Sequence, residues 1–215
     1  MSRSVLLTCL LIPAMVQAAN APSTSDHSKV MVSTATAHAY FAMGCFWCGE
    51  NDFEGRPGVR SVVSGYTGGK EKNPTYEQVS SHMTGHFEAV DVAYDPARIS
   101  YEKLLDIFWH SVDPTQADGQ FCDLGKQYRS AIFYRDSTEM KAAYATKRAL
   151  EKSGVLKKPI VTLILPAGTF WPAEEYHQNF CRVNPDQYNS YREGCGRDKR
   201  LALIWGASAA KPAAH

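Results

Sequence analysis

The feature that most constrains the fold is an alternation of short strand-like and helix-like segments between residues 38 and 165. Short apolar or alternating runs predict strands over residues 38–43, 59–66, 87–94, 128–134 and 159–165. Between them, glycine, proline and capping residues delimit predicted helices over residues 45–53, 74–80, 100–109 and 136–154. A last helix is predicted to open at Pro172, and the polar chain after Cys181 is predicted to be irregular. In one chain of 215 residues, this pattern predicts a single domain of the mixed α/β class.

The N-terminal residues 1–18 have the layout of a secretory signal peptide. Arg3 precedes an apolar run, Val5 to Val16, that is too short to span a bilayer, and Ala18 ends a small-residue cleavage pattern. A buried N-terminal helix is the alternative interpretation, which Pro13 disfavours. We therefore expect a periplasmic or secreted protein, cleaved after Ala18, with no membrane insertion after cleavage.

The rest of the chain is expected to comprise a flexible linker over residues 19–36, one domain over residues 37–206 and a loose tail over residues 207–215. Lys and Arg total 23 against 22 Asp and Glu. With this balance, no field of one sign would attract nucleic acid, and a partner must be recognised by a local site. We expect a monomer that binds no nucleic acid.

Cleavage would leave an odd number of cysteines, namely Cys45, Cys48, Cys122, Cys181 and Cys195. At least one thiol must then stay unpaired in an oxidising compartment, where it is a candidate reactive group. Cys45 follows a predicted strand and opens a predicted helix. Backbone N–H groups and the helix dipole at that position stabilise a thiolate, so a lowered pKa is expected for Cys45. Phe46 and Trp47 beside it could form the apolar wall of a pocket.

Three other interpretations of the Cys-x-x-Cys segment remain open. A structural disulfide would close too small a loop to stabilise the chain much. A zinc site could use Cys45 and Cys48 with His177 and Cys181. A general thiol–disulfide oxidoreductase could use Cys45 and Cys48 alone, although two bulky aromatic residues between the cysteines are not typical of it.

Five motifs, in order between about residue 38 and residue 182, resemble those of A-type peptide methionine sulfoxide reductases. They are Gly44-Cys45-Phe46-Trp47, Gly65-Tyr66-Thr67-Gly68-Gly69, Gly85-His86-Phe87-Glu88-Ala89-Val90, Asp123-Leu124-Gly125-Lys126-Gln127-Tyr128-Arg129-Ser130 and Glu174-Glu175-Tyr176-His177-Gln178. The resemblance implies a two-layer α+β sandwich with a ferredoxin-like β-α-β-β-α-β core, extra helices and an irregular C-terminal segment. It implies reduction of the S epimer of methionine sulfoxide, with no metal and no organic cofactor.

The resemblance also implies roles for individual residues. The nucleophile would be Cys45, and the groups around the substrate would be Glu88 as acid, Tyr66 and Tyr128 on the sulfoxide oxygen, Asp123 as an orienting residue, and Phe46 and Trp47 around the S-methyl group. His86 and His177 are expected to be structural. The strand pattern supports Glu88 independently, because it shares a face with Val90 and Val92. A carboxyl group on an apolar face has a raised pKa and can stay protonated near neutral pH.

Attack by Cys45 would leave a sulfenic acid that condenses with a second thiol. Cys195, between Gly194 and Gly196, is the first candidate for that resolving thiol, and Cys48 is the alternative. Cys122 and Cys181 could pair structurally or extend the relay, and the sequence does not separate these possibilities. The resemblance implies recycling by a thioredoxin-like reductant. The expected substrates are oxidised proteins or peptides and free methionine sulfoxide.

Overall fold

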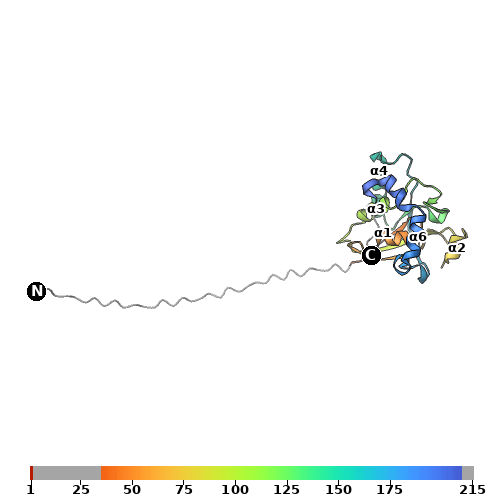
Figure 1. The fold of residues 1–215 in the computed structure, drawn as a ribbon, viewed down its shortest axis with the longest axis horizontal. Coiled ribbons are helices and arrows are strands. Elements are labelled where there is room, and N and C mark those ends of the chain that lie inside the picture. The colour runs from red at the N-terminus through yellow and green to blue at the C-terminus, as the bar shows by residue number, and fades with distance from the viewer. Residues whose placement is uncertain (2–34, 210–215) are drawn as a thin grey trace. The chain divides into compact units, whose positions relative to one another are not determined.

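The computed structural model describes Met1 and residues 35–209, and its centre is a six-stranded sheet (Figure 1). The strands are β1 (Ala37–Ala42), β2 (Val59–Thr67), β3 (Phe87–Tyr94), β6 (Ala131–Tyr134), β7 (Leu163–Pro166) and β8 (Trp171–Pro172). Their order across the sheet is β7-β6-β1-β3-β2-β8. All neighbours are antiparallel except β6 and β7, which are parallel.

The expected β-α-β-β-α-β core is present within this sheet. It runs β1, α1 (Phe46–Phe53), β2, β3, α3 (Tyr101–His110) and β6, and its strands lie in the order β6-β1-β3-β2. In each of the connections β1-α1-β2 and β3-α3-β6, the two strands that are joined lie on either side of one antiparallel strand. This is the arrangement expected of a ferredoxin-like core. Two further α-helices precede β7, namely α2 (Tyr76–Ser80) and α4 (Ser137–Ser153).

The sheet is buried on both faces. One face packs against α1 and α3 in a core that contains Phe41, Val90 and Val92 from the sheet and Phe53 and Phe108 from the helices. The opposite face forms a smaller cluster of Ala42, Phe87, Ala89, Ala131 and Phe133, on which Phe170 packs. Side chains along a strand point alternately to the two faces of the sheet. Glu88 therefore shares a face of β3 with Val90 and Val92, and this face packs against α1.

Helix ends occur where the predicted capping residues stand. The Ser100 hydroxyl accepts a hydrogen bond from the backbone N–H of Lys103 at the start of α3. The Asp136 carboxylate accepts from Thr138 and Glu139 at the start of α4, and Gly154 ends that helix in the left-handed region at φ 71°. Local capping chemistry therefore predicted these boundaries correctly.

The C-terminal part of the domain is helical, so the expectation of an irregular segment is wrong there. It contains α5 (Phe180–Val183), α6 (Pro185–Gly194), α7 (Arg197–Trp205) and the 3₁₀ helix η3 (Gly206–Ser208). Asn51 of α1 donates a hydrogen bond to the Tyr188 hydroxyl of α6 over 2.7 Å, and α1 and α6 lie side by side (Figure 1). In α6 and α7, only one or two large apolar side chains are buried in each helix, together with one buried arginine, Arg192 or Arg197. This explains why a hydrophobic period was not visible.

The helix predicted to open at Pro172 is also absent, because Pro172 lies in β8 at the edge of the sheet. Trp171 and Pro172 pair with Tyr66 and Gly65, and Ala173 N–H donates to Ser64 O over 2.9 Å. A proline is tolerated at an edge, where its missing N–H breaks no ladder. The 3₁₀ helix η2 (Glu175–His177) follows instead.

Other elements also differ from the prediction. The strands β6 and β7 begin at Ala131 and Leu163, later than expected. The predicted polar loop over residues 111–126 contains a hairpin of β4 (Gly119–Gln120) and β5 (Asp123–Leu124), followed by the 3₁₀ helix η1 (Lys126–Tyr128).

Several predictions concern residues outside the described part of the chain. They are the signal peptide apart from Met1, the linker up to residue 34 and the tail from residue 210. The predicted loose tail began at residue 207, but residues 207 and 208 belong to the 3₁₀ helix η3. Residues 35 and 36 are exposed and have no regular structure. Within the described residues, no helix combines the length and apolar character needed to cross a membrane.

Candidate active site

Cys45 lies at the N-terminus of α1, directly after the turn that ends β1. Its carbonyl oxygen accepts hydrogen bonds from Cys48 N–H and Gly49 N–H over 3.1 and 3.2 Å. Gly44 makes the turn with φ +84°, and a Cβ there would lie 2.7 Å from the Cβ of Gln120. Only glycine fits this position, so the Gly-Cys pair is required by the backbone.

A small cavity of about 60 Å³ opens beside Cys45. Its lining consists of Cys45, Phe46, Trp47, Tyr76, Glu88, Asp123, Tyr128 and Tyr191. Its volume is far below the roughly 300–1,000 Å³ of drug-sized ligand pockets, so it can take only the tip of a side chain. Six of the eight residues were predicted from sequence, and Tyr76 and Tyr191 were not.

Glu88 reaches the cavity as a buried carboxyl group with 2% of its surface exposed. One carboxyl oxygen, Oε2, accepts a hydrogen bond from the backbone N–H of Phe46 over 3.1 Å. Burial raises the pKa of Glu88 to about 8, against the opposing effect of this hydrogen bond. The side chain is therefore protonated at neutral pH and can donate a proton into the cavity.

The pKa values of the two buried thiols, Cys45 and Cys48, shift in opposite directions. Burial and the hydrogen bond between the two side chains raise the pKa of Cys45 well above its ordinary value. The same hydrogen bond lowers the pKa of Cys48 to about 7 against the effect of burial, and the guanidinium groups of Arg197 and Arg192 lower it further. The predicted lowering of the Cys45 pKa is wrong, because burial raises that pKa and the nearby arginines act on Cys48.

These two arginines belong to a buried ion cluster beneath α1 that sequence reasoning missed. Arg197, only 2% exposed, contacts Asp52 Oδ2 over 3.0 Å and donates to the carbonyl oxygens of Met43 and Ser111 over 3.0 and 2.7 Å. Arg192 contacts the other Asp52 oxygen over 3.2 Å. In the sequence, the arginines stand in a polar stretch with nothing to distinguish them from surface residues.

The Trp47 side chain is held rigidly by its neighbours. Its ring stacks on Phe180 with centroids 3.7 Å apart, and Nε1 donates to His177 Nδ1 over 3.2 Å. Burial lowers the pKa of His177, which keeps the imidazole neutral and able to accept this bond. His177 thus has the structural position expected for it, as does buried His86, which contacts the Glu71 carbonyl oxygen through Nε2 over 2.8 Å.

The predicted tyrosines occupy different positions. Tyr128 lines the cavity, and burial raises the pKa of its hydroxyl, which therefore stays a donor. Tyr66 is paired with Glu88 across β2 and β3, but its hydroxyl donates to Glu174 Oε2 over 2.9 Å and it is not among the lining residues. Tyr76, for which burial raises the pKa to about 12, stands in the cavity wall.

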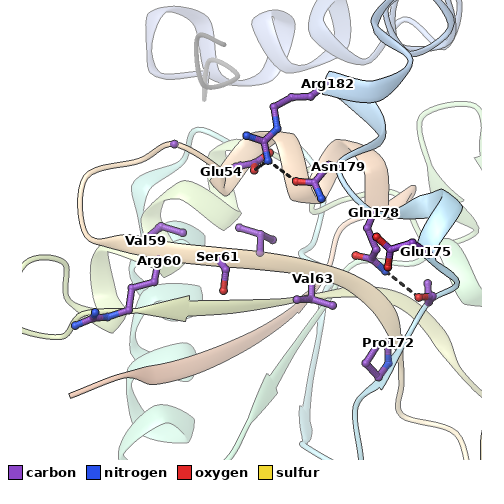
Figure 2. A pocket seen from close by; sticks show the side chains of 13 residues that line it. Glu54, Val59, Arg60, Ser61, Val63, Pro172, Glu175, Gln178, Asn179 and Arg182 are labelled. Atoms are coloured by element: carbon purple, nitrogen blue, oxygen red, sulfur yellow. Dashed lines mark hydrogen bonds and ion pairs between the residues drawn. The ribbon is translucent and has the colours of Figure 1, made fainter. Parts of the chain in front are cut away.

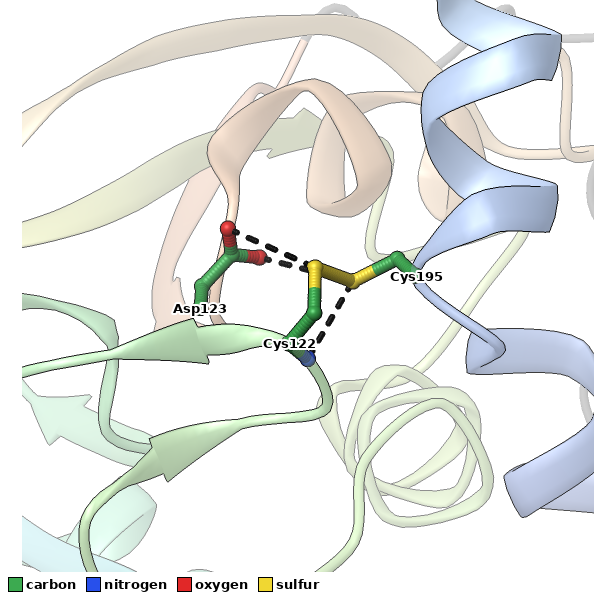
Figure 3. Close-up of side chains that lie close together, drawn as sticks. All are labelled: Cys122, Asp123 and Cys195. Carbon is green, nitrogen blue, oxygen red and sulfur yellow. Dashed lines mark hydrogen bonds between the residues drawn. A yellow bond between two sulfur atoms is a disulfide. The ribbon is translucent and has the colours of Figure 1, made fainter.

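A disulfide between Cys122 and Cys195 lies next to the cavity and joins the β4–β5 hairpin to the end of α6 (Figure 3). Asp123 lines the cavity and places Oδ1 3.9 Å from Cys122 Sγ and Oδ2 4.0 Å from Cys195 Sγ. The Tyr191 hydroxyl, one turn before Cys195, donates to Asp123. A structural pair of Cys122 with Cys181 is thereby excluded.

The zinc alternative finds no geometric support in residues 35–209. The donor atoms of Cys45, Cys48, His177 and Cys181 do not converge, and His177 Nδ1 is used by Trp47. The three side chains that could share an ion are Cys122, Asp123 and Cys195, two of which are joined in the disulfide.

A larger groove of about 580 Å³ lies along β2, beside the C-terminal end of α1. Glu54, Asn179 and Arg182 converge at one end of it (Figure 2). Its lining contains no cysteine and shares no residue with the small cavity. The candidate nucleophile Cys45 and the buried acid Glu88 therefore both line the smaller opening and not the larger groove.

Comparison with known proteins gives consistent results. Residues 37–209 match the family described as peptide methionine sulfoxide reductase. The chain is 53% identical over 168 residues to the peptide methionine sulfoxide reductase MsrA of Halalkalibacterium halodurans, covering 78% of this chain and 96% of the relative. It is 52% identical over 169 residues to the same enzyme of Bacillus subtilis, covering 79% and 96%.

Solved structures show the same relationship. Reduced Mxr1 from Saccharomyces cerevisiae superimposes with a TM-score of 0.65 at 30% identity over 70% of this chain and 86% of the other. Methionine sulfoxide reductase A of Corynebacterium diphtheriae gives a TM-score of 0.62 at 32% identity over 72% and 77%. With a thiol, a protonated carboxyl and a tip-sized cavity in the same place, this chain belongs to the peptide methionine sulfoxide reductase family, in its A-type branch.

Proposed function

We propose that this oxidoreductase reduces methionine S-sulfoxide, either free or within oxidised proteins and peptides, at the Cys45 cavity. The observation that carries the proposal is the pairing of Cys45 with the raised-pKa carboxyl of Glu88 in one cavity of about 60 Å³. A sulfoxide sulfur is electrophilic, but its oxygen leaves only after it has been protonated. A thiol and an acid in one site supply both requirements.

In the first step, the S-methyl group lies against Phe46 and Trp47, and the sulfoxide oxygen faces Glu88. Glu88 donates its proton to that oxygen, and the Tyr128 hydroxyl supports it with a hydrogen bond. Cys45 passes its proton to the hydrogen-bonded Cys48 thiolate and attacks the sulfur. Methionine leaves with two electrons gained, and the oxygen stays on Cys45 as a sulfenic acid.

Tyr66 and Asp123 have supporting parts in this scheme. Tyr66 packs on Phe46 with ring centroids 5.9 Å apart and holds Glu174 through its hydroxyl, which fixes the cavity wall. Asp123 orients the Tyr191 hydroxyl at the cavity edge. Both residues thus position groups that meet the substrate.

In the second step, a thiol condenses with the sulfenic acid to form a disulfide and water. We assign this step to Cys195, since Asp123 lies beside both the cavity and the Cys195 sulfur. Cys48, already hydrogen-bonded to Cys45, is the alternative. A thioredoxin-like dithiol protein would then restore the thiols.

The test is an intact-mass measurement on pre-reduced mature protein mixed with one equivalent of methionine S-sulfoxide. Wild type is expected to lose two hydrogen atoms, while Cys45→Ser is unchanged. A resolving-thiol variant, Cys195→Ser or Cys48→Ser, that gains an oxygen instead identifies the partner of Cys45. Equal reaction of wild type and Cys45→Ser would refute the proposal.

One observation favours a second candidate, general thiol–disulfide exchange, namely the lowered pKa of Cys48 in a Cys-x-x-Cys segment. The two candidates separate in Glu88→Gln. Exchange on unrelated disulfides would survive this substitution, whereas sulfoxide reduction would not.

We further propose that the protein acts outside the cytoplasm, in the periplasm or as a secreted monomer. The support is the signal-peptide layout of residues 1–18. N-terminal sequencing of protein from fractionated cells should begin at Ala19, and light scattering should give the mass of one chain. A product that begins at Met1 in the cytoplasmic fraction would overturn the location.

A further inference from the structure

One edge of the central sheet is only partly covered by a neighbouring strand. Strand β2 pairs with β8 at two residues, Gly65 and Tyr66. The groove of about 580 Å³ lies along residues 59–63 of the same strand (Figure 2). An uncovered strand edge presents backbone N–H and C=O groups that can pair with another extended chain. The groove therefore lies where the sheet has room for a further strand.

The hydrogen bonds of Ser64 show which backbone groups of β2 face this edge. The N–H of Ser64 donates to Gln178 Oε1 over 3.0 Å, and its carbonyl oxygen accepts from Gln178 Nε2 and Ala173 N–H, each over 2.9 Å. Val62 lies two residues earlier in an unbroken register with β3, so its N–H and C=O point to the same side. Within residues 35–209, no hydrogen bond engages these two groups of Val62.

The wall of the groove opposite β2 holds an acceptor that lacks a donor (Figure 2). Glu54 pairs with Arg182 through Oε1, but its other oxygen, Oε2, is buried and has no hydrogen-bond partner within the described part of the chain. An unpaired buried oxygen costs free energy, which a donor from a ligand would recover. The Glu54 side chain is 17% exposed, so a small rotation of the carboxylate would offer Oε2 to a donor in the groove.

The charges of the groove balance. Its lining contains two acids, Glu54 and Glu175, and two bases, Arg60 and Arg182. A lining with both signs in equal number does not select an anion or a cation. A neutral polypeptide backbone, which offers N–H donors and C=O acceptors, matches both the charge balance and the polar groups of the groove.

The groove and the Cys45 cavity lie at the two ends of α1. Phe46, the first residue of the helix, lines the cavity, and Glu54, just after its last residue, lines the groove. A helix of 8 residues is about 12 Å long, which equals about four residues of extended chain. The cavity takes only the tip of a side chain, so the main chain of a polypeptide substrate lies outside it, within reach of the groove.

We propose that the groove is a second binding site for oxidised polypeptide substrates, which holds their main chain, and this proposal rests on the function proposed above. A substrate segment adds to the edge of β2 as an extended strand. Its backbone pairs with the N–H and C=O of Val62, and one backbone N–H on its other side donates to Glu54 Oε2. Strand addition draws its affinity from main-chain hydrogen bonds, which suits substrates that share one oxidised side chain in varied sequences.

The first test measures kcat/KM of the wild type for peptides with one methionine S-sulfoxide. The peptides carry two, four, six or eight alanine and threonine residues on one side of the sulfoxide, first toward the N-terminus and then toward the C-terminus. In one of these directions kcat/KM should rise at least about fivefold with length, mainly through a lower KM, because the longer chains reach the groove. A kcat/KM that does not depend on length in either direction would overturn the proposal.

A peptide with methylated backbone nitrogens tests strand addition itself. The longest peptide is prepared with every flanking nitrogen methylated, which keeps its length and side chains but removes the N–H donors. The gain in kcat/KM over the shortest peptide should disappear. A gain that survives methylation would mean that the peptide does not bind as an added strand.

A variant pair assigns the effect to the groove. Glu54→Met removes the unpaired acceptor and should lower the ratio of kcat/KM for the longest peptide to kcat/KM for free methionine S-sulfoxide at least about fivefold. Glu151→Met, at an exposed position of α4 outside the groove, is the matched control and should change this ratio less than about twofold. Equal ratios in the two variants would exclude the groove as the peptide site. No turnover of free methionine S-sulfoxide by wild type would instead refute the reductase activity itself.

Discussion

The two cysteine pairs of this enzyme differ in almost every physical respect. Cys45 and Cys48 are neighbours on one helical turn, buried and reduced, whereas Cys122 and Cys195 are 73 residues apart, closer to solvent and oxidised. The buried pair shares a hydrogen bond and faces arginines that favour a thiolate on Cys48. The difference teaches that the partner of a cysteine is decided by its surroundings in the fold and not by spacing along the chain.

The largest expected effect is on the buried pair. Cys45→Ser should lower the rate of methionine formation by at least about a thousandfold, because the serine hydroxyl is a far weaker nucleophile. Stopped reactions with product quantification measure this. Cys181→Ser, a substitution in the same cluster of buried residues, should stay close to wild type. A comparable loss in that control would mean that packing, rather than the nucleophile, is being measured.

Glu88→Gln should lower the rate by about 10²–10⁴-fold, the usual contribution of a general acid. Because the protonated form is active and the pKa is about 8, the wild-type rate should fall as pH rises through that value. The fall should vanish in the variant. Glu50→Gln is the matched control, since Glu50 is also buried, with a pKa raised to about 7 by burial, but lies outside the cavity lining. A fall near pH 8 that persists in Glu88→Gln would assign it to another group.

Arg197→Met should lower the free energy of unfolding by about 3–5 kcal/mol. The substitution breaks a buried ion pair and leaves part of the buried Asp52 charge without a partner. Urea titration measures this change. Arg200→Met on the same helix removes a half-exposed ion pair to Asp113 and should cost about 1 kcal/mol or less. The pKa of Cys48, followed by thiolate absorbance, should rise only in Arg197→Met. Equal effects of the two substitutions would contradict the special role of the buried cluster.

Loss of the surface bridge should have the smallest effect. Removing the Cys122–Cys195 link by Cys122→Ser should lower the free energy of unfolding by about 2–4 kcal/mol, through the larger entropy of the unfolded chain. The reduced wild type should show the same loss and remain folded, because Cys195 must be a thiol before it can resolve Cys45. Unfolding of the reduced protein without denaturant would show that the bridge is structural.

Much of the fold followed from local patterns. The capping residues Ser100 and Asp136 placed the starts of α3 and α4, and alternation along β3 placed Glu88 on the core side. These predictions succeeded because capping and strand periodicity act over a few residues. The C-terminal helices α6 and α7 were missed because buried arginines and single aromatic residues anchor them to the rest of the domain, and such contacts leave no period in the sequence.

The features of the active site also divide into those that local sequence predicts and those that depend on the tertiary structure. The sequence alone determined the Gly-Cys turn, the aromatic wall and the acid, since each is carried by a short motif. Only the tertiary structure decided that Tyr76 and Tyr191 join the cavity and that Tyr66 turns its hydroxyl to Glu174.

The charges and the disulfide depended most on the tertiary fold. The hydrogen bond to Cys45 and two distant arginines lower the pKa of Cys48, and packing of the β4–β5 hairpin against the end of α6 paired Cys122 with Cys195. The physical reason is the distance along the chain over which each interaction acts. A turn, a cap or a strand face is decided by neighbouring residues, whereas a pKa or a disulfide partner is decided by whatever the completed fold brings within a few ångströms.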